Sequence, residues 1–403
     1  MSEFFLARQP ILDRELRLHA YELLFRSSRY NANLGEFDGD TATARVIATA
    51  AELGIERLTR GRAAFINLPQ RFIEEPDLMP LSPDTVVLEI LESVALNDAA
   101  MAGIRSLRER GFRIALDDFV DSESFDAILP IVDTVKLDVR ALDPAQWHVQ
   151  IARLRGHGCK LLAEKVETSQ EFEMLRDLGV DYFQGFFFAR PSMFRGRQIA
   201  PDRMNLVQTL MRLSDPECSL EEIQELVGRD VALSVKALNY VNSSANGLKR
   251  KIDSVREAIF YLGRDEVKRW VSVFLLASEE SKPQELMTLA LTRAKTCELL
   301  ATRLGRDDAD VFFTTGLLSM LDSFLDARLD DILPGMNLTA DMQAALLEET
   351  GDKGAALALA KQLELGEDIE PEATLDLGFE SLAEVYAEAV MWADENLREM
   401  GIE

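Results

Sequence analysis

The feature of this sequence that most constrains its fold is a series of short apolar segments in its first half, each ending near a polar side chain. Six of them are separated by helix-like stretches or turns and span residues 63–68, 85–92, 113–119, 132–138, 160–167 and 181–188. Strands and helices that alternate at this spacing imply a parallel sheet. So many units in a row favour a TIM-like (β/α) barrel, which keeps its chemistry at the carboxyl ends of the strands.

Two further strands are predicted before this series. Residues 4–12 are apolar but contain Gln9 and Pro10, and Pro10 suits a terminal or edge strand because proline donates no ladder hydrogen bond. Residues 16–25 alternate loosely and end near Glu22 and Arg26. Helices are expected at 41–53, 97–110, 146–155 and 171–178.

The polar residues at the strand ends suggest a metal site. Asp117 and Asp118 are adjacent after an apolar run, and Glu22, Asn67 and Glu89 lie near other strand ends. Such an oxygen-rich set suits Mg²⁺ or Mn²⁺. Taken singly, the aspartates could cap a helix, the glutamates could form salt bridges, and Asn67 could cap the next helix. The agreement of seven strand ends favours a shared site.

Three more strand residues extend this set. Lys136 adds a cation, Glu164 a candidate base and Gln184 a polar anchor, although Lys136 could instead pair with Asp138. This mixture suits hydrolysis of a phosphate ester, in which metal ions polarise the phosphorus centre and generate hydroxide from water.

Length and charge limit the other possibilities. A chain of 403 residues favours two domains. A net charge of −26 argues against a surface that wraps DNA or RNA, but it allows a small anionic ligand held by metal ions. No run approaches the roughly 18 apolar residues of a membrane span, and the start lacks a basic signal peptide, so a cytoplasmic protein without a membrane anchor is expected. Cys159, Cys218 and Cys297 are too far apart to indicate a disulfide framework or a zinc site.

From residue 198 onward the strand pattern is replaced by helical periodicity. Leu206, Leu210 and Leu213 fall on one helical face. Ser219 to Glu222 and Ser254 to Glu257 have the form of capping boxes that begin helices. An all-helical second domain at 198–403, with an acidic helical tail, is therefore predicted.

The order of the motifs in residues 1–197 resembles the EAL domain of cyclic-di-GMP phosphodiesterases. The matching residues are Gln9-Pro10, Glu22-Leu-Leu-Phe-Arg26, Asn67, Glu89-Ile-Leu-Glu92, Asp117-Asp118-Phe119, Lys136-Leu-Asp138, Ala163-Glu-Lys-Val-Glu167 and Gln184-Gly185. The reaction that this resemblance implies is the opening of one phosphodiester of cyclic di-GMP, which gives linear pGpG.

The resemblance also implies a role for each residue. One metal ion, Mg²⁺ or Mn²⁺, would be bound by Glu22, Asn67, Glu89 and Asp117, and a second by Asp117 with Asp118. Lys136, Glu164 and Glu22 would be catalytic, with Lys136 at the attacking water or a metal-bound oxygen and Glu164 as a base or metal-linked acid. The nucleotide would be held by Gln9, Arg26 and Gln184.

Three departures from the family pattern support an alternative. The family follows Asp-Asp-Phe with Gly-Thr-Gly-Tyr-Ser-Ser in the loop of the second metal and the dimer contact, where this chain has Val120 to Phe125. Leu91 replaces a threonine and Lys165 a glycine. The alternative is a weak or inactive EAL domain that acts as a cyclic-di-GMP sensor or a protein-binding regulator, and a homodimer is one assembly to test.

Residues 230–244 and 258–263 resemble an HDOD domain, a helical module related to HD-type metal phosphohydrolases. Those relatives carry Gly-Leu-Leu-His-Asp where this chain has Gly316 to Met320, and no histidine follows His157. The second domain is therefore expected to bind a protein partner or to regulate. The alternative is a helical domain that only stabilises the barrel.

Overall fold

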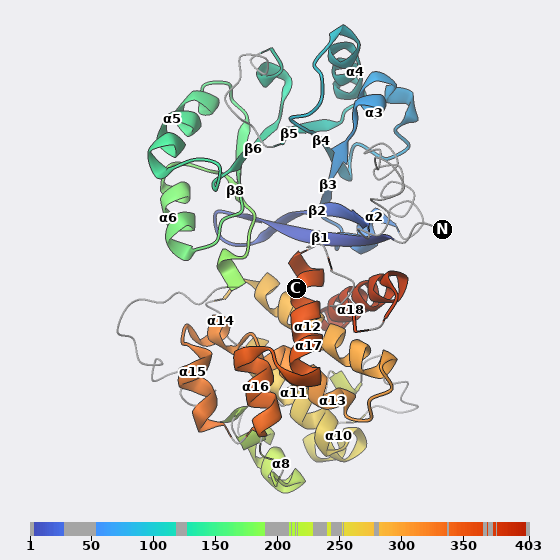
Figure 1. The fold of residues 1–403 in the computed structure, drawn as a ribbon, viewed down its shortest axis with the longest axis vertical. Helices are drawn as coiled ribbons and strands as arrows, with labels where there is room; N and C mark the ends of the chain where they lie inside the picture. Colours follow the sequence, from blue (N-terminus) through green and yellow to red (C-terminus); the bar gives the residue numbers. More distant parts are fainter. Residues whose placement is uncertain are drawn as a thin grey trace. The chain divides into compact units, whose positions relative to one another are not determined.

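The computed structural model divides the chain into two compact units, Met1–Arg190 and Pro191–Glu403, which are drawn in blue to green and in yellow-green to red in Figure 1. The predicted boundary after residue 197 lies outside the described residues. The structure describes residues 4–27, 54–117, 127–189, 209–210, 212–213, 215, 217–228, 240–242, 252, 254–277, 282–336, 338–365, 369, 374–375 and 377–399.

The first unit is a closed barrel of eight strands in the order of the sequence, which confirms the predicted TIM-like fold. From β2 to β8 neighbouring strands are parallel. The strands are β1 (Phe4–Asp13), β2 (Leu18–Ser27), β3 (Ala63–Leu68), β4 (Val86–Ile90), β5 (Arg113–Leu116), β6 (Thr134–Asp138), β7 (Lys160–Glu164) and β8 (Tyr182–Phe183).

Strand β1 departs from the parallel pattern, because it runs antiparallel to both β2 and β8. A short turn joins β1 to β2, and a turn of that length can connect only antiparallel strands. The Asp13 carboxylate fixes this turn by accepting hydrogen bonds from the backbone N–H groups of Glu15 and Arg17, each at 2.9 Å. Pro10 lies beyond the short stretch where β1 pairs with β8, at Leu12 and Asp13.

Helices cover the outside of the barrel, as α4, α5 and α6 show in Figure 1. Helices α5 and α6 begin earlier than predicted, because Gln146 and Glu171 close capping boxes with Asp143 and Thr168. The predicted helix at 41–53 lies outside the described residues. The described helices are α2 (Ile55–Leu58), α3 (Gln70–Glu74), α4 (Asp98–Glu109), α5 (Pro144–Arg155) and α6 (Ser169–Asp177), with 3₁₀ turns at Pro76–Leu78, Leu129–Ile131 and Phe187–Ala189.

Several strands are shorter than predicted, and β8 shows the clearest cause. The expected strand at 181–188 ends at Phe183. Gly185 then has φ of 139°, and a Cβ atom there would lie 2.2 Å from the carbonyl oxygen of Val166. The chain turns sharply at this glycine, and only a residue without a side chain fits so close to the neighbouring backbone.

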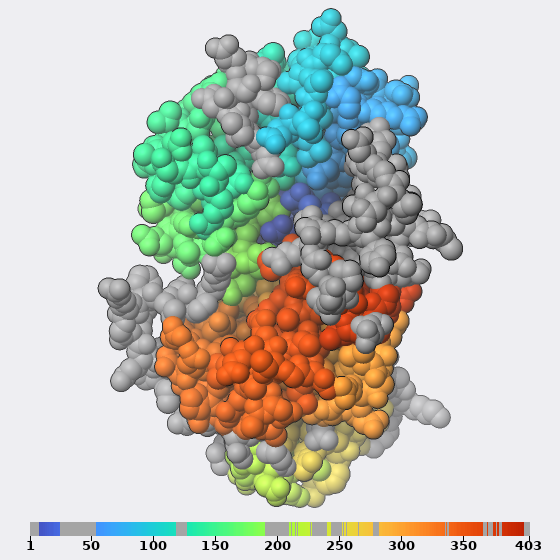
Figure 2. All heavy atoms as spheres, in the orientation of Figure 1, coloured from blue at the N-terminus to red at the C-terminus, as the bar shows by residue number. Residues whose placement is uncertain are grey.

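The second unit is all helical in its described part, as predicted. Its central helix is α12, most of whose residues are buried. In the space-filling view, α16 and α17 in orange form one continuous face (Figure 2). The helices are α8 (Leu220–Gly228), α10 (Val255–Leu262), α11 (Arg264–Ala277), α12 (Gln284–Arg303), α13 (Ala309–Leu318), α14 (Leu321–Leu325), α15 (Leu329–Ile332), α16 (Ala340–Glu348), α17 (Gly351–Leu365) and α18 (Phe379–Glu399).

The predicted helix starts are present in this unit. Ser219 and Glu222 form a reciprocal capping box, with backbone to side-chain distances of 2.9 and 3.2 Å. The Ser254 hydroxyl accepts from the Glu257 N–H at 3.1 Å at the start of α10. Most of the HDOD-like stretch at 230–244 lies outside the described residues. Among the described helices, none is both long enough and apolar enough to cross a bilayer.

Candidate active site

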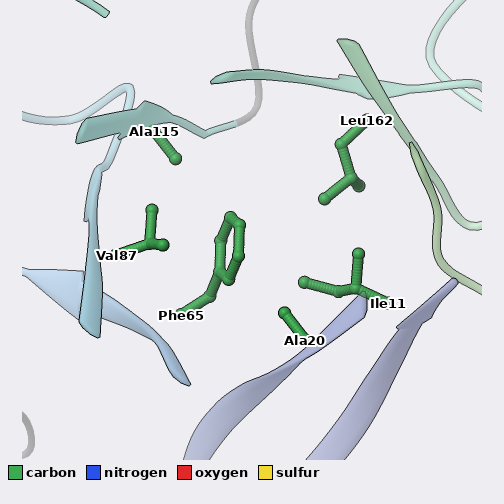
Figure 3. Packing of buried hydrophobic residues seen from close by; sticks show 6 residues of the cluster. All are labelled: Ile11, Ala20, Phe65, Val87, Ala115 and Leu162. Carbon is green, nitrogen blue, oxygen red and sulfur yellow. The ribbon is translucent and has the colours of Figure 1, made fainter. Parts of the chain in front are cut away.

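An apolar layer fills the interior of the barrel. We call it the barrel plug, and its members point toward one another in Figure 3. Because one residue comes from each of six strands, the plug closes the barrel and makes a floor for the space at the carboxyl ends of the strands. The plug consists of Ile11, Ala20, Phe65, Val87, Ala115 and Leu162.

Each plug residue lies two positions from a predicted site residue in the same strand or just beyond its end. Side chains two residues apart in a strand point to the same side, so the site residues lie one layer above the plug. In the antiparallel strand β1 the order is reversed, and Gln9 precedes Ile11. The pairs in the parallel strands are Ala20 with Glu22, Phe65 with Asn67, Val87 with Glu89, Ala115 with Asp117, and Leu162 with Glu164.

The side chain of Lys136 lies at the centre of this polar layer, and it is only 1% exposed. Its Nζ lies 2.7 Å from Glu89 Oε1, 2.8 Å from Asp117 Oδ1, 2.9 Å from Glu164 Oε1 and 3.4 Å from Glu22 Oε1. Five strands or strand ends therefore meet at one ammonium group.

The charges of this cluster do not balance. Four carboxylates around one ammonium carry a formal charge of −3 when all are ionised. Burial, reinforced by Glu22, raises the pKa of Glu89 well above its usual value, and burial raises the pKa of Glu164 to about 8 against the opposing effect of Lys136. For Lys136, burial lowers the pKa, but the surrounding carboxylates outweigh it and the pKa is raised. Such a buried excess of negative charge calls for protons or a further cation.

A second polar contact joins the residue just after β8 to strands β1 and β2. Gln184 Nε2 donates to Glu22 Oε2 at 2.6 Å and to Gln9 Oε1 at 3.1 Å. Within the described part of the chain, Gln184 Oε1 and Glu89 Oε2 are buried acceptors without a hydrogen-bond partner. Unsatisfied buried oxygens of this kind mark a place for a ligand, a water molecule or a hard cation.

The cluster is not arranged as a ready-made metal site. Among the described residues, no group of three histidine, cysteine or acidic side chains has the geometry to hold a metal ion. The Lys136 ammonium group lies within 2.8 Å of both Glu89 and Asp117. The donor set itself fits a hard divalent cation, since it is rich in oxygen, carries excess negative charge and includes the orphaned oxygen of Glu89. Asp118, the loop Val120 to Phe125 and the side chain of Arg26 lie outside the described residues.

Two structural alternatives for single residues are not realised. The residue that precedes helix α3 is Pro69, so Asn67 does not cap it. Asp138 pairs with Lys165 rather than Lys136, at 2.5 Å from Lys165 Nζ. Lys165 occupies the position of the family glycine and has φ of 55°, a left-handed conformation that glycine adopts more readily. The contact of Lys165 with Asp138 was not expected from the sequence.

In the second unit, the residue at the position of the missing histidine contacts a buried ion pair. Ser319 occupies the histidine position, and its hydroxyl accepts from Arg293 Nη1 at 3.1 Å. Arg293 also donates to both oxygens of Glu364, at 2.6 to 3.1 Å. Arg293 and Glu364 are both buried. A guanidinium–carboxylate pair thus satisfies this part of the interior.

The chain was compared with known proteins. Residues 2–191 match the EAL domain family, and residues 200–333 match the HDOD domain family. A Vibrio cholerae protein named cyclic di-GMP phosphodiesterase CdgJ is 35% identical over 98% of this chain and 93% of its own length. The uncharacterized protein YuxH of Bacillus subtilis is 31% identical over 96% of this chain and 97% of its own length.

Solved structures also resemble the first unit. The BlrP1 protein of Klebsiella pneumoniae, in a complex with calcium and cyclic di-GMP, is 25% identical over 47% of this chain and 55% of its own, with a TM-score of 0.39. The assignment rests on the sequence matches, which run in the same order along nearly the whole chain. The chain therefore belongs to the family of proteins in which an EAL domain is followed by an HDOD domain.

Proposed function

We propose that the barrel binds cyclic di-GMP with Mg²⁺ or Mn²⁺ and hydrolyses one of its phosphodiester bonds to give pGpG. The observation that carries the proposal is the cluster of four carboxylates around Lys136 at the carboxyl ends of the strands. The activity in the name of CdgJ, which aligns along almost its whole length, supports the same reaction.

The metal ligands follow from the donor set. Glu22, Asn67, Glu89 and Asp117 would hold one divalent cation, and Asp117 with Asp118 a second. When bound, such a cation polarises the phosphorus centre and lowers the pKa of water. The excess negative charge of the cluster and the orphaned Glu89 Oε2 support this assignment.

The remaining residues orient the substrate and move protons. Lys136 keeps its positive charge inside the carboxylate cluster, where it can position the attacking water. Glu164 has a raised pKa of about 8 in the metal-free protein, so it can exchange a proton with water near neutral pH. Glu22 orients Gln184 through their 2.6 Å hydrogen bond, and Gln184 with Gln9 and Arg26 would hold the nucleotide.

For the second unit we propose a regulatory role through a protein partner. Its support is the replacement of the HD-type ligands by Ser319 and the buried Arg293–Glu364 pair, which offers no metal chemistry. The partner and the assembly, including a homodimer, are open to direct test by light scattering and affinity capture.

A second candidate function is a nucleotide sensor that binds without turnover. It is favoured by Lys165, which stands directly after Glu164 where the family has a glycine. Lys165 has a left-handed backbone conformation and contacts Asp138. A change next to a catalytic carboxylate can displace it enough to slow the reaction.

Chromatography of the products separates the two functions. Purified protein is incubated with cyclic di-GMP and Mg²⁺ or Mn²⁺, and binding is titrated in parallel with Ca²⁺. Appearance of pGpG that Glu22→Ala abolishes supports hydrolysis. Tight binding without product supports the sensor. The absence of both binding and product contradicts both functions.

A further inference from the structure

Glu164, the candidate base, is the last residue of strand β7 and is 8% exposed. Its carbonyl oxygen accepts a hydrogen bond at 3.3 Å from the N–H of Val139, the residue that follows β6. Its side-chain Oε1 lies 2.9 Å from Lys136 Nζ. The direction of a side chain depends on the backbone that carries it, so the conformation of the next residue bears on the proposed chemistry.

That next residue, Lys165, has a backbone conformation that lysine seldom adopts. Its φ is 55°, in the left-handed region, where a residue with a side chain is less stable than glycine. Val166 fixes the chain beyond it, because its N–H donates to the Gln184 carbonyl at 3.0 Å and its carbonyl accepts from the Phe187 N–H at 3.2 Å. A strained residue of this kind persists where its surroundings hold it.

Asp138, the last residue of β6, holds the Lys165 side chain. Its Oδ2 lies 2.5 Å from Lys165 Nζ, and its Oδ1 accepts from the backbone N–H of Arg140 at 2.7 Å. Asp138 also lies opposite Glu164 in the register of β6 and β7. One carboxylate therefore ties the turn after β6 to the residue that follows Glu164.

Arg140 holds the Lys165 backbone. Its Nε donates to the Lys165 carbonyl oxygen at 3.3 Å, and its Nη2 lies 2.9 Å from Glu171 Oε2. Glu171 in turn accepts from the N–H groups of Glu167 and Thr168, at 2.9 and 3.1 Å, where α6 begins. The segment between β7 and α6 is therefore held through both its side chains and its backbone.

The exposure of the Lys165–Asp138 pair limits what it adds to stability. The two side chains are 58% and 17% exposed, and ion pairs between exposed groups contribute little to the free energy of folding. A second pair of the same kind, Lys160 with Asp181 at 2.7 Å, lies at the opposite end of β7, and its lysine is 59% exposed. The two pairs are matched in charge and in exposure of the lysine, but only the first adjoins Glu164.

We propose that Lys165 is a positioning residue, whose ion pair with Asp138 holds Glu164 in the orientation that hydrolysis requires. This inference rests on the phosphodiesterase activity proposed for the barrel. A displacement of a reacting group by about 1 Å can slow a reaction on the order of a hundredfold, so a bond that adds little stability can still govern the rate. Because Lys165 acts through Glu164 and not on the nucleotide, its loss lowers kcat and not the affinity for substrate.

Steady-state turnover of cyclic di-GMP with Mn²⁺ by the full-length protein tests this role. Lys165→Met keeps the stem of the side chain and removes its charge, and we expect kcat to fall about tenfold while KM stays within about twofold of the wild-type value. Lys160→Met makes the same change in the matched pair and is expected to keep the wild-type kcat. Equal kcat in the two variants, or faster turnover by Lys165→Met, overturns the proposal.

Asp138→Asn separates position from charge. It removes a negative charge where Lys165→Met removes a positive one, so an effect of the electric field on the site would have opposite signs in the two variants. Loss of the bond between them has the same sign in both, and we expect kcat to fall about tenfold in Asp138→Asn and no further in the double variant. Opposite effects of the single variants, or additive losses in the double variant, overturn the proposal.

The outcomes distinguish this inference from the function on which it rests. Absence of pGpG from the wild type contradicts the proposed hydrolysis, and the inference falls with it. Turnover by the wild type with an unchanged kcat in Lys165→Met contradicts the inference alone. Circular dichroism checks the fold of each variant, and if Lys165→Met does not fold, Asp138→Asn compared with Lys160→Met decides the question.

Discussion

Lys136 Nζ lies 2.7 Å from Glu89 Oε1, and the two side chains are 1% and 0% exposed. A buried ion pair adds little stability when it is complete, but removal of one partner leaves the other charge uncompensated. Here three more carboxylates share the same ammonium group. The barrel therefore depends on Lys136 when no metal ion is bound.

Lys136→Met is expected to destabilise the metal-free protein by about 3–5 kcal/mol, because it leaves four buried carboxyl groups without their cation. Urea unfolding in EDTA measures the change. Lys160→Met is the matched control, since Lys160 is 59% exposed in its pair with Asp181 and its loss costs under ~1 kcal/mol. Equal effects of the two variants would show that the cluster is not buried as described.

Glu364→Gln is expected to destabilise the second unit by about 3–5 kcal/mol, since it leaves the Arg293 guanidinium buried without its carboxylate. Thermal unfolding measures this loss. Glu384→Gln removes an equivalent charge from the exposed pair with Arg303 and is expected to cost under ~1 kcal/mol. A small loss in both variants would contradict the structural role assigned to the Arg293–Glu364 pair.

Gly185→Ala is expected to destabilise the barrel and to weaken cyclic-di-GMP binding. Its Cβ would lie 2.2 Å from the carbonyl oxygen of Val166, so the backbone that positions Gln184 must shift. Gly158 also has positive φ, but a Cβ atom added there would have no other atom within 4 Å. Gly158→Ala is therefore expected to cost only the ~1 kcal/mol of the left-handed backbone. Urea unfolding and nucleotide titration of both variants make the comparison, and equal losses would contradict the close approach at Gly185.

Cys297 predicts a specific pH dependence of stability. Burial, with a contribution from Glu364, raises the pKa of its thiol to about 12. An unfolded cysteine loses its proton near pH ~8.5, so between that pH and about 12 the folded state binds the extra proton. This contribution to stability is complete below pH ~8.5 and falls by up to ~1.4 kcal/mol per pH unit above it.

Urea unfolding between pH 8 and 10.5 measures this slope for the wild type and for Cys297→Ala. The alanine variant is expected to be less stable at pH 8 but to lose stability less steeply as the pH rises. Parallel slopes in the two proteins would show that the Cys297 thiol ionises as readily when folded as when unfolded.

The sequence predicted the barrel because its strands alternate with helices and end in polar residues. It also contained the pattern that places these residues, since Ala20, Val87 and Leu162 each stand two positions before a site carboxylate. Strand alternation makes this spacing a sign of a shared interior face. The spacing of these residues alone therefore indicates the division of the barrel interior into an apolar plug and a polar layer.

Other features depended on contacts between distant residues. The early end of β8 follows from the approach of Gly185 to Val166, and nothing in residues 181–188 alone indicates it. The antiparallel direction of β1 follows from the turn held by Asp13. The pairing of Asp138 with Lys165 depends on the register of β6 and β7, in which Asp138 lies opposite Glu164, and the sequence alone does not give this register.

The most direct test of the central claim is the turnover of cyclic di-GMP with Mn²⁺ by the wild type and two matched variants. Glu89→Gln removes a buried carboxylate that contacts Lys136, while Glu92→Gln makes the same change at an exposed position just beyond β4. The account predicts pGpG from the wild type and from Glu92→Gln, and at least a hundredfold slower turnover by Glu89→Gln. Equal turnover by the two variants, with both folded, would contradict it.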